Sequence, residues 1–259
     1  MMTVLKPDWP APKNIHTAIS TRSGGQSVSP WNELNLAFHV GDSPKVVEKN
    51  WQLLSEQLLS KKQPLPSSPQ LLEQIHGTTI VTAKCDGFIP VADGCYTNQA
   101  GRVCTVMTAD CLPILICNRA GTEVAAVHAG WRGLAAGIVG QVINRFDASP
   151  SELMVYLGPA ISQPHFEVGA EVLDAFLAND FLAKAPQQYV RRNIENCFIK
   201  KEAEHWQADI YGLAKIALHE QGVTQVFGAE YCTYADAQKF YSYRRDGQTG
   251  RMASLIWIS

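Results

Sequence analysis

The stretch that decides the fold runs from Thr105-Val-Met-Thr-Ala-Asp-Cys-Leu-Pro-Ile-Leu-Ile-Cys117 to Val127-His-Ala-Gly-Trp-Arg-Gly133. A short apolar strand is predicted at 103–107, and Pro113 keeps the chain extended after the polar bend that follows it. A second strand, 123–127, leads into His128 and a glycine turn. Cys111 and His128 are therefore predicted at strand ends, at the mouth of a sheet.

The rest of the chain alternates between strand and helix patterns. Helical spacing follows His128, with Leu134, Ile138 and Val142 on one stripe and Val139, Ile143 and Phe146 beside it. Further strands are predicted at 15–21, 78–83, 153–157, 197–200, 225–231 and 253–258, helices at 45–59, 167–178 and 209–218, and a loop at 181–188. Without a strict βαβ period, this alternation predicts an α/β (α+β) fold. We expect a single layered domain over residues 1–259, with a mixed β-sheet core flanked by helices.

Composition and charge exclude several classes of partner. The 259 residues carry 22 basic and 24 acidic side chains, a formal charge of −2, so bulk charge predicts neither nucleic acid nor an anionic membrane as partner. No segment approaches the roughly 20 apolar residues that span a bilayer, and the first residues lack an apolar signal core. Seven cysteines at irregular spacing predict reduced thiols in a cytoplasmic protein. Oligomeric state is not predicted.

A third residue shares the position of Cys111 and His128. His76, in Gln74-Ile-His-Gly77, also stands beside a glycine next to a predicted strand. The three match the Cys/His₂ set of a catalytic zinc, which leaves a fourth position open. Their intervals of 35 and 17 residues are too long for a zinc finger. On spacing alone, a structural role for His76 stays open.

Two basic, glycine-bearing loops are candidate anion sites. Arg22 precedes Ser-Gly-Gly25, and the run from Tyr241 to Arg251 contains Arg244 and Arg245. Guanidinium groups can fork onto phosphate or carboxylate. A surface turn in the first case, and a solvated face in the second, are the alternative interpretations.

Several motifs together closely resemble the laccase-domain (YfiH-like) family, also described as purine nucleoside phosphorylase and as peptidoglycan editing factor. They are Gln74-Ile-His-Gly77, Thr108-Ala-Asp-Cys-Leu-Pro113, His128-Ala-Gly-Trp-Arg-Gly133, Leu157-Gly-Pro-Ala-Ile161, Tyr243-Arg-Arg-Asp-Gly247 and Thr249-Gly-Arg251. Thr21-Arg-Ser-Gly-Gly25 and the segment 34–42, which contains Asn35, are similar to the N-terminal signature of the family. Trp51 departs from the pattern, because an Arg after Asn is common there, and any phosphate role of that position is therefore in question.

The resemblance implies a site and an activity. It implies His76, Cys111 and His128 as ligands of Zn²⁺, with Cu²⁺ as the alternative ion. It implies phosphorolysis of adenosine, inosine and methylthioadenosine to base plus ribose 1-phosphate, together with adenosine deamination. An open zinc position suits deamination, because it activates water for attack on the purine.

Two groups of side chains would support these reactions. Asp110 and Asp93 are the carboxylates nearest to the predicted ligands and could carry the proton in deamination; Asp110 could instead only orient its neighbours. For phosphate we expect the helix start after His128 with Arg132, helped by Arg22 or Arg244 from the loops, with Asn35 as a further substrate contact.

Other activities stay open at this point. The editing-factor name implies a hydrolase that removes L-Ser from UDP-MurNAc-L-Ser, through the same zinc or through Cys111 as nucleophile with His128 as base. A multicopper oxidase needs many histidines, typically in His-X-His pairs; this chain has seven histidines and no such pair. A single copper could give only weak polyphenol oxidation. A binding module with structural zinc needs a fourth ligand. We interpret the remaining cysteines in that part of the chain as small core residues or as residues outside the site; they are Cys85, Cys95, Cys104 and Cys117.

Overall fold

The computed structural model describes residues 3–178, 187–202 and 204–259. Its strands form three sheets. In the order of hydrogen-bonded neighbours, the four-stranded sheet contains β1 (Val4–Leu5), β2 (Ile15–Ser20), β13 (Met252–Ile258) and β5 (Val103–Thr108). The six-stranded sheet contains β12 (Gln225–Gly228), β8 (Leu153–Leu157), β6 (Leu112–Asn118), β7 (Val124–Ala129), β4 (Gly94–Thr97) and β3 (Ile80–Thr82). The small sheet contains β10 (Phe198–Lys200), β11 (His205–Ala208) and β9 (Glu167–Gly169).

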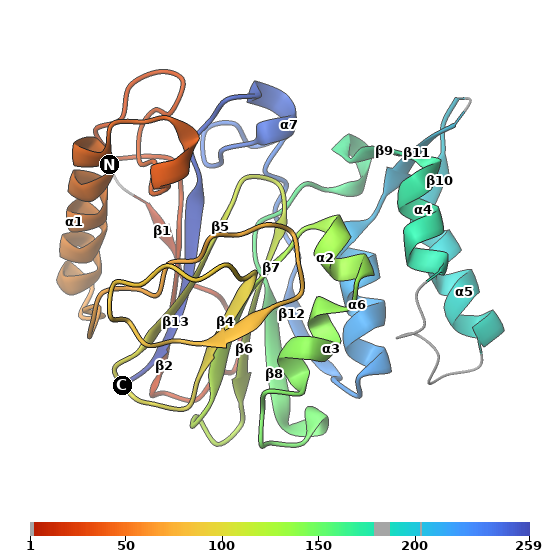
Figure 1. Ribbon diagram of the computed structural model, residues 1–259, viewed down its shortest axis with the longest axis horizontal. Helices are drawn as coiled ribbons and strands as arrows, with labels where there is room; N and C mark the ends of the chain where they lie inside the picture. Colours follow the sequence, from red (N-terminus) through yellow and green to blue (C-terminus); the bar gives the residue numbers. More distant parts are fainter. Residues whose placement is uncertain (1–2, 179–186, 203) are drawn as a thin grey trace.

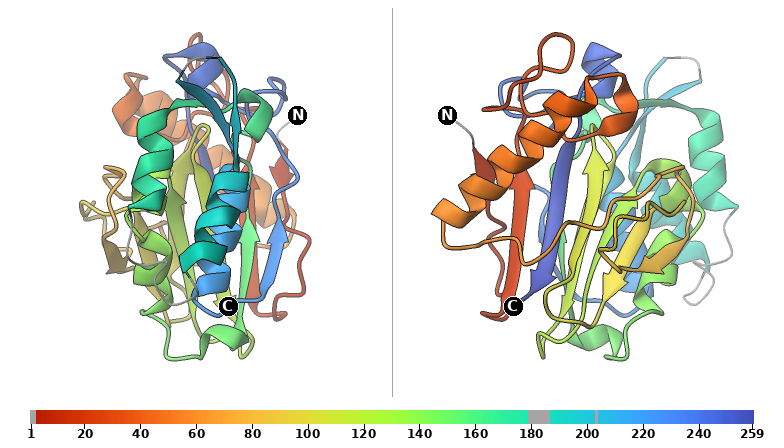
Figure 2. Two further views of the ribbon diagram at one scale, coloured as in Figure 1. Left: turned by 90° about the vertical axis from the view of Figure 1, so that its right-hand side faces the viewer. Right: turned by 60° about the vertical axis from the view of Figure 1, so that its left-hand side comes forward.

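Helices cover both outer faces of the two large sheets (Figure 1, Figure 2). The α-helices are α1 (Pro44–Ser60), α2 (Trp131–Ala135), α3 (Ile138–Ile143), α4 (Ala170–Leu177), α5 (Gln187–Asn196), α6 (Ile210–Glu220) and α7 (Tyr243–Asp246). Three short 3₁₀ helices are η1 (Phe38–Val40), η2 (Pro150–Glu152) and η3 (Gln163–His165). Helix α1 lies on one side of the sheets, and α2 to α6 lie on the other.

The two large sheets pack face to face and form the centre of the protein. Val106 and Ile256 of the four-stranded sheet share one buried cluster with Leu115 and Ala126 of the six-stranded sheet. Side chains alternate along a strand, so the next residue of β6, Ile116, points outward and packs against the helices of the other layer. Because both faces are covered, β6 is an apolar strand buried at every position. The predicted mixed β core with flanking helices is confirmed, and it consists of two stacked sheets.

The connection between β5 and β6 carries the chain from one sheet to the other. These strands are neighbours in sequence, yet β5 pairs with β13 and β6 pairs with β7 and β8. The three linking residues, 109–111, include Asp110 at φ +92°. Non-glycine residues rarely adopt that backbone region, so other contacts must hold the bend. Cys111 is therefore placed at the edge where the two sheets meet.

Several element boundaries agree with the sequence patterns, and two do not. Strand β8 matches the predicted 153–157, and α1 exceeds the predicted 45–59 by one residue at each end. The single helix expected after His128 is wrong, because Gly137 at φ +91° separates α2 from α3. The helix expected at 167–178 starts only at 170, since its first three residues pair with β11. Most of the predicted 181–188 loop lies outside the described residues.

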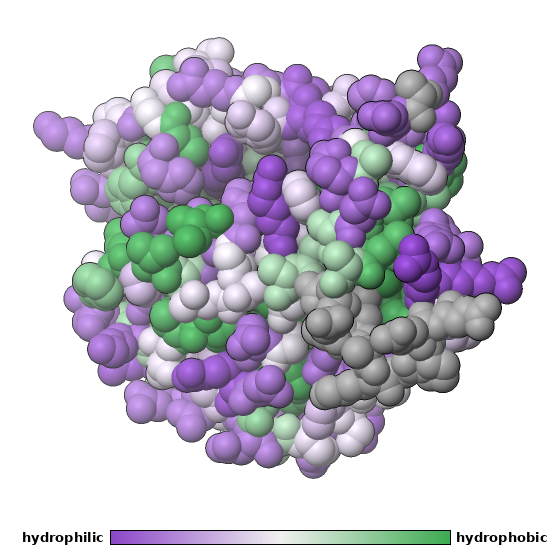
Figure 3. Space-filling view, turned by 45° about the vertical axis from the view of Figure 1, so that its right-hand side comes forward, coloured by the Kyte–Doolittle hydropathy of each residue, from purple (hydrophilic) through white to green (hydrophobic). Residues whose placement is uncertain are grey.

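Among the described residues, no helix is long and apolar enough to cross a bilayer. On the face drawn in Figure 3, hydrophilic residues predominate and hydrophobic residues form separate patches.

Candidate metal centre

Three side chains from distant parts of the chain meet at one end of the six-stranded sheet. His76 comes from the loop before β3, Cys111 from the crossing between the sheets, and His128 from the end of β7. One ligand atom of each lies within 4.8 Å of the other two. The Cys111 Sγ to His76 Nε2 distance is 3.6 Å. Metal–ligand lengths of about 2.0 to 2.3 Å put the ligand atoms of a tetrahedral zinc roughly 3.3 to 3.6 Å apart, so the Cys111–His76 separation matches such an ion, and the 4.8 Å limit for the whole group requires only a small closure on binding.

Asp93 organises two of the three ligands. Its Oδ1 lies 2.8 Å from Nδ1 of His128, so the proton on that nitrogen faces the carboxylate and Nε2 is left for a metal. The same carboxylate accepts the backbone N–H groups of Ile75, His76 and Gly77 at 2.6 to 3.2 Å. His76 has φ +63°, a left-handed conformation that these three bonds stabilise. Asp93 therefore fixes one ligand by its ring and the other by its backbone.

The electrostatics of the cluster favour the metal-binding form of Cys111. Burial alone would raise the pKa of this thiol, but the charge of His128 and hydrogen bonds with both imidazoles lower it to about 6. Burial would lower the pKa of His128, whereas the Cys111 thiolate and Asp93 raise it to about 9. A thiolate is the nucleophilic and metal-ligating form of cysteine. At neutral pH the site is thus an ion pair whose proton a divalent cation can displace.

Glycines allow the segments that carry the ligands to approach one another. A Cβ on Gly130 would lie 2.6 Å from Cδ2 of His76 and 3.1 Å from Sγ of Cys111. A Cβ on Gly133 would lie 2.7 Å from the carbonyl oxygen of Gly77. Only glycine leaves α2 this close to the loop that carries His76.

The metal group opens onto a cavity of about 720 Å³. All three residues line the cavity, and His128 is the most buried of them. Other lining residues are apolar or aromatic (Met107, Trp131, Ile161, Phe166, Val168, Val172, Tyr243) or charged (Arg132, Glu167, Glu171, Arg244, Arg251). Among the residues that the structure describes, the metal-ligating group has three members and no fourth. A bound ion would keep an open position, as in catalytic zinc sites.

The predicted substrate residues divide into two pairs. Arg132 and Arg244 line the cavity, whereas Arg22 and Asn35 do not. Nε and Nη2 of Arg22 donate to the carbonyl of Asn32, and Nη1 donates to that of Ala237. Asn35 is fully buried, and its amide bonds to the chain around it.

Asp110 lines the cavity, but both of its carboxylate oxygens are engaged by the protein. Oδ1 accepts the hydroxyl of Thr233 at 2.6 Å, and Oδ2 accepts the hydroxyl of Ser242 at 3.0 Å and the backbone N–H of Arg244 at 2.7 Å. These bonds attach the start of α7 to the crossing that carries Cys111. They also compensate for the unusual backbone conformation of Asp110.

Some residues that line the cavity are not among the site residues predicted from the sequence. Phe166, Glu167 and Glu171 lay in or beside a predicted amphipathic helix, where apolar spacing hid their position on the cavity wall. Arg251 belongs to the basic run and to the family motif Thr249-Gly-Arg251, but it is not among the predicted substrate residues. The glycine before it, within Thr249-Gly-Arg251, is the one signal that could have distinguished it from its neighbours.

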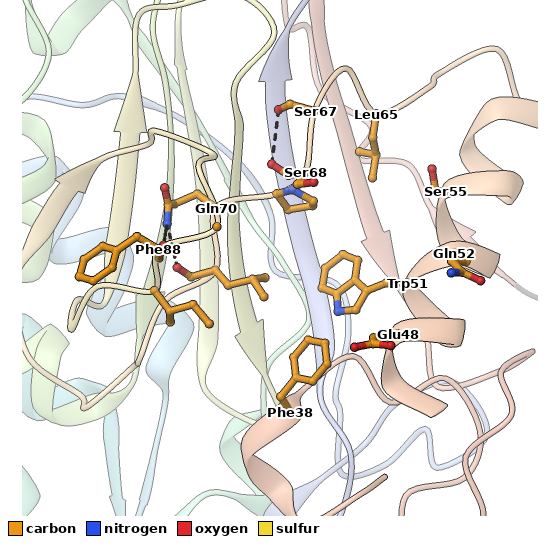
Figure 4. Close-up of a pocket in the computed structure, with 14 residues that line it drawn as sticks. Phe38, Glu48, Trp51, Gln52, Ser55, Leu65, Ser67, Ser68, Gln70 and Phe88 are labelled. Atoms are coloured by element: carbon orange, nitrogen blue, oxygen red, sulfur yellow. Dashed lines mark hydrogen bonds between the residues drawn. The ribbon is translucent and has the colours of Figure 1, made fainter. Parts of the chain in front are cut away.

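A second cavity, of about 550 Å³, lies on the other side of η1 (Figure 4). It is enclosed by α1 and by the loops around 65–71 and 87–89. Phe38 of η1 lines this cavity while the next residue, His39, lines the metal cavity. The ring of Trp51 points into the second cavity, and its Nε1 donates to the carbonyl of Leu36 at 2.9 Å. Position 51 therefore contributes to a different cavity from the metal group.

Comparison with known proteins places the chain in a family. Residues 16–259 match the model of the family described as multi-copper polyphenol oxidoreductase laccase. The chain belongs to this family. It is 46% identical to the purine nucleoside phosphorylase YfiH of Shigella flexneri, and 45% identical to that of Escherichia coli K12, over the whole length of each protein. The family resemblance stated from the motifs is thereby confirmed.

Solved structures agree with this assignment. The Neisseria meningitidis protein NMB0706 superposes with a TM-score of 0.88 at 43% identity, covering 99% of both chains. YlmD from Geobacillus stearothermophilus superposes with a TM-score of 0.87 at 29% identity, covering 98% of this chain and 96% of that one. The fold is thus that of the YfiH-like proteins over nearly the full length.

Proposed function

We propose that this chain is a metal-dependent purine nucleoside phosphorylase that acts as one catalytic domain. The observation that carries the proposal is the Cys/His₂ group, ordered by Asp93, opening onto a cavity that also contains guanidinium groups. A metal donor set and anion donors on one cavity wall suit a reaction between a neutral nucleoside and phosphate. The names of the full-length relatives support the same activity.

The proposed substrates are adenosine, inosine and methylthioadenosine, cleaved to base plus ribose 1-phosphate, with adenosine deamination as a second reaction. Zn²⁺ is the proposed ion, because two imidazoles and a thiolate are donors it favours; Cu²⁺ is the alternative, since it binds such ligands more strongly. When bound, the ion supplies Lewis-acid chemistry and makes water acidic enough to react near neutral pH.

The chain itself binds and orients the reactants. Arg244 donates one Nη1 bond to the carbonyl of Glu167 at 2.8 Å and has further N–H groups for phosphate. Arg132 stacks 4.3 Å over the ring of Trp131 and is exposed at the cavity rim. Helix α2 has only five residues, so we assign phosphate binding to these side chains rather than to the helix start. Phe166 and Trp131 offer apolar surface for the purine.

Asp93 and Asp110 receive supporting roles in this proposal. Asp93 holds a proton on Nδ1 of His128, so that the proton that a metal displaces is the one on the opposite nitrogen, Nε2. Asp110 positions the crossing that carries Cys111 against α7. Neither carboxylate has an oxygen without a protein donor, which argues for orientation over proton transfer.

The test is product analysis. Zinc-loaded protein is incubated with inosine and phosphate, and hypoxanthine and ribose 1-phosphate are quantified by chromatography; adenosine and methylthioadenosine follow, with inosine formation from adenosine reporting deamination. Cys111→Ala is expected to be inactive. Cys232→Ser, a half-buried cysteine outside the ligand group, is the matched control. Failure to release base from all three nucleosides would overturn the proposal.

Two other activities are tested alongside. The family description names a multicopper oxidase, but the described residues contain one three-ligand group and thus no cluster for several coppers. The rate at which copper-loaded protein oxidises a phenol measures the oxidase activity of a single bound copper ion. UDP-MurNAc-L-Ser tests the editing hydrolase. The cysteines that the structure describes are all free, in keeping with the proposed cytoplasmic location.

A further inference from the structure

The arginines near α7 differ in how many of their donors the protein itself uses. Arg22 donates from all three guanidinium nitrogens to backbone carbonyls. Arg245 donates from all three as well, to the carbonyls of Thr233, Tyr234 and Phe240 and to Asp246. Neither lines the metal cavity. These two residues therefore hold the loop together and have little left to offer an anion.

Arg251 lines the metal cavity and is held rigidly from two sides. Its backbone N–H donates to Oδ1 of the buried Asn35 at 3.0 Å. Nη1 donates to the carbonyls of Thr249 and Gly250 at 2.9 and 3.0 Å. The guanidinium also lies 5.8 Å from the centre of the Tyr243 ring. Within the described part of the chain, Nε and Nη2 have no hydrogen-bond partner, so one edge of a fixed, planar fork is available.

The positive charge of Arg251 is only partly balanced by the protein. No carboxylate within the described ranges forms an ion pair with it. Burial lowers the pKa of the guanidinium, and the charges of Cys111 and Asp110 only partly offset that effect. Asp110 directs its oxygens to Thr233, Ser242 and the Arg244 backbone. A half-buried cation without a carboxylate partner is unfavourable, and an anionic ligand relieves that cost.

We propose that Arg251 is the main oxyanion-binding residue of the cavity, and that its free Nε/Nη2 edge binds inorganic phosphate beside the Cys111 metal ligand. This inference rests on the proposed function in one respect, that phosphate is the co-substrate. Asn35, which sequence reasoning placed among the substrate contacts, acts through Arg251 by fixing its backbone.

Arg251 is better suited to this role than the two arginines named from the sequence. Arg132 is exposed and stacks on Trp131, so it must lose side-chain freedom and water on binding. Arg244 has one donor fixed on Glu167 and lies 5.6 Å from the Phe166 ring, on the wall formed by β9. The Arg251 guanidinium is already held by hydrogen bonds and lines the same cavity as Cys111, and preorganisation of this kind favours affinity.

The experiment is calorimetric titration of zinc-loaded protein with inorganic phosphate, without nucleoside, at constant ionic strength. Arg251→Gln is expected to raise the Kd for phosphate about tenfold or more, as expected when charge-assisted hydrogen bonds are lost. Arg251→Lys keeps the charge but loses the planar edge with two donors, so its Kd for phosphate should lie between those of the unmodified chain and Arg251→Gln. Arg191→Gln removes the same charge from an exposed pair with Glu195 on α5 and should leave the Kd unchanged. Arg132→Gln and Arg244→Gln should each change it less than Arg251→Gln.

Further measurements separate Arg251 from the metal and from the fold. The metal content of Arg251→Gln should match that of the unmodified chain, since Arg251 is not among the proposed ligands, and thermal unfolding verifies that the variant is folded at the temperature of the titration. The titration is repeated after chelation, and the dependence on Arg251 should persist. The inference is overturned if chelation abolishes phosphate binding while substitution of Arg251 does not change it. It is also overturned if the Kd of Arg251→Gln for phosphate lies within twofold of that of the unmodified chain.

The outcome is distinguishable from failure of the proposed function. If phosphate binding depends on Arg251 but the protein releases base from no nucleoside, the proposed anion site stands and the proposed phosphorylase activity is wrong. If the protein releases base only when phosphate is present, but the KM for phosphate is unchanged in Arg251→Gln, the proposed phosphorylase activity stands and the role of Arg251 in phosphate binding is wrong.

Discussion

Oδ1 of Asp93 lies 2.8 Å from Nδ1 of His128, and both side chains are buried. The other bonds of this carboxylate go to the backbone of the loop that carries His76. One side chain thus links two members of the candidate metal group that are 52 residues apart in the sequence. Metal affinity should depend on Asp93 although it does not itself belong to the ligand group.

Asp93→Ala is therefore expected to weaken zinc affinity by about 10- to 100-fold, the usual cost of losing a partner that orients a ligand. Competition with a chromogenic chelator measures this directly. Asp93→Asn keeps an oxygen acceptor and should lose less. Asp147→Asn, an exposed position after α3, is the matched control. Unchanged zinc affinity in Asp93→Ala would show that the ligands do not need this carboxylate.

Cys111→Ala should bind no stoichiometric zinc and remain folded. The thiolate is the only charged donor of the group, and the residue is half-buried in a short crossing rather than in the core. Elemental analysis of the purified variant gives the metal content, and circular dichroism confirms the fold. In the unmodified chain, chelation should make Cys111 accessible to iodoacetamide, and added zinc should restore protection. A variant that retains one zinc per chain would contradict the ligand assignment.

Asp110→Ala should mainly destabilise the protein. The change removes three hydrogen bonds to an acidic side chain in an unusual backbone conformation, and we expect a loss of about 3 kcal/mol or more in the free energy of unfolding. Thr233→Val removes one of these bonds and should cost about 1 kcal/mol. Urea unfolding measures both. If Asp110→Ala instead kept full stability and lost only kcat for deamination, a proton-transfer role would be favoured.

The sequence, with the family resemblance that it carries, names the three residues that meet at the candidate metal group, but it does not name Arg251 among the substrate residues. Each of His76, Cys111 and His128 stands at a bend next to an apolar strand, and such local patterns can be read without coordinates. Arg22 and Arg251 look alike in sequence, since each follows or precedes glycines in a polar loop. What separates them is the number of guanidinium nitrogens already bound to carbonyls: Arg22 uses all three, one of them on Ala237, 215 positions away, whereas Arg251 uses only Nη1, on its neighbours Thr249 and Gly250.

The stacking of two sheets was also beyond local patterns. Strands β5 and β6 are both apolar and only three residues apart, a pattern that equally suits a hairpin within one sheet. Their separation into different sheets depends on the late strand β13, which pairs with both β2 and β5. The predicted single helix after His128 failed for a local reason, because a glycine inside a helical pattern does not reveal its φ angle.

Gly130→Ala provides a steric test of the metal centre. Gly130 has φ −63° and ψ 157°, which alanine adopts readily, so the substitution should introduce no backbone strain. The new Cβ would lie 2.6 Å from Cδ2 of His76 and would push this ring away from Cys111. We expect zinc affinity to fall about tenfold or more, because ligand geometry is what distinguishes a metal site from three neighbouring side chains.

Gly140→Ala is the matched control for this test. Gly140 lies within α3, where a Cβ would meet nothing closer than 3.6 Å, so alanine should stabilise the protein by about 0.5 to 1 kcal/mol and leave zinc affinity unchanged. Thermal unfolding and chelator competition on both variants separate the two effects. Equal zinc affinity in Gly130→Ala and Gly140→Ala would mean that His76 can move without consequence, and the assignment of His76 as a ligand would then have to be withdrawn.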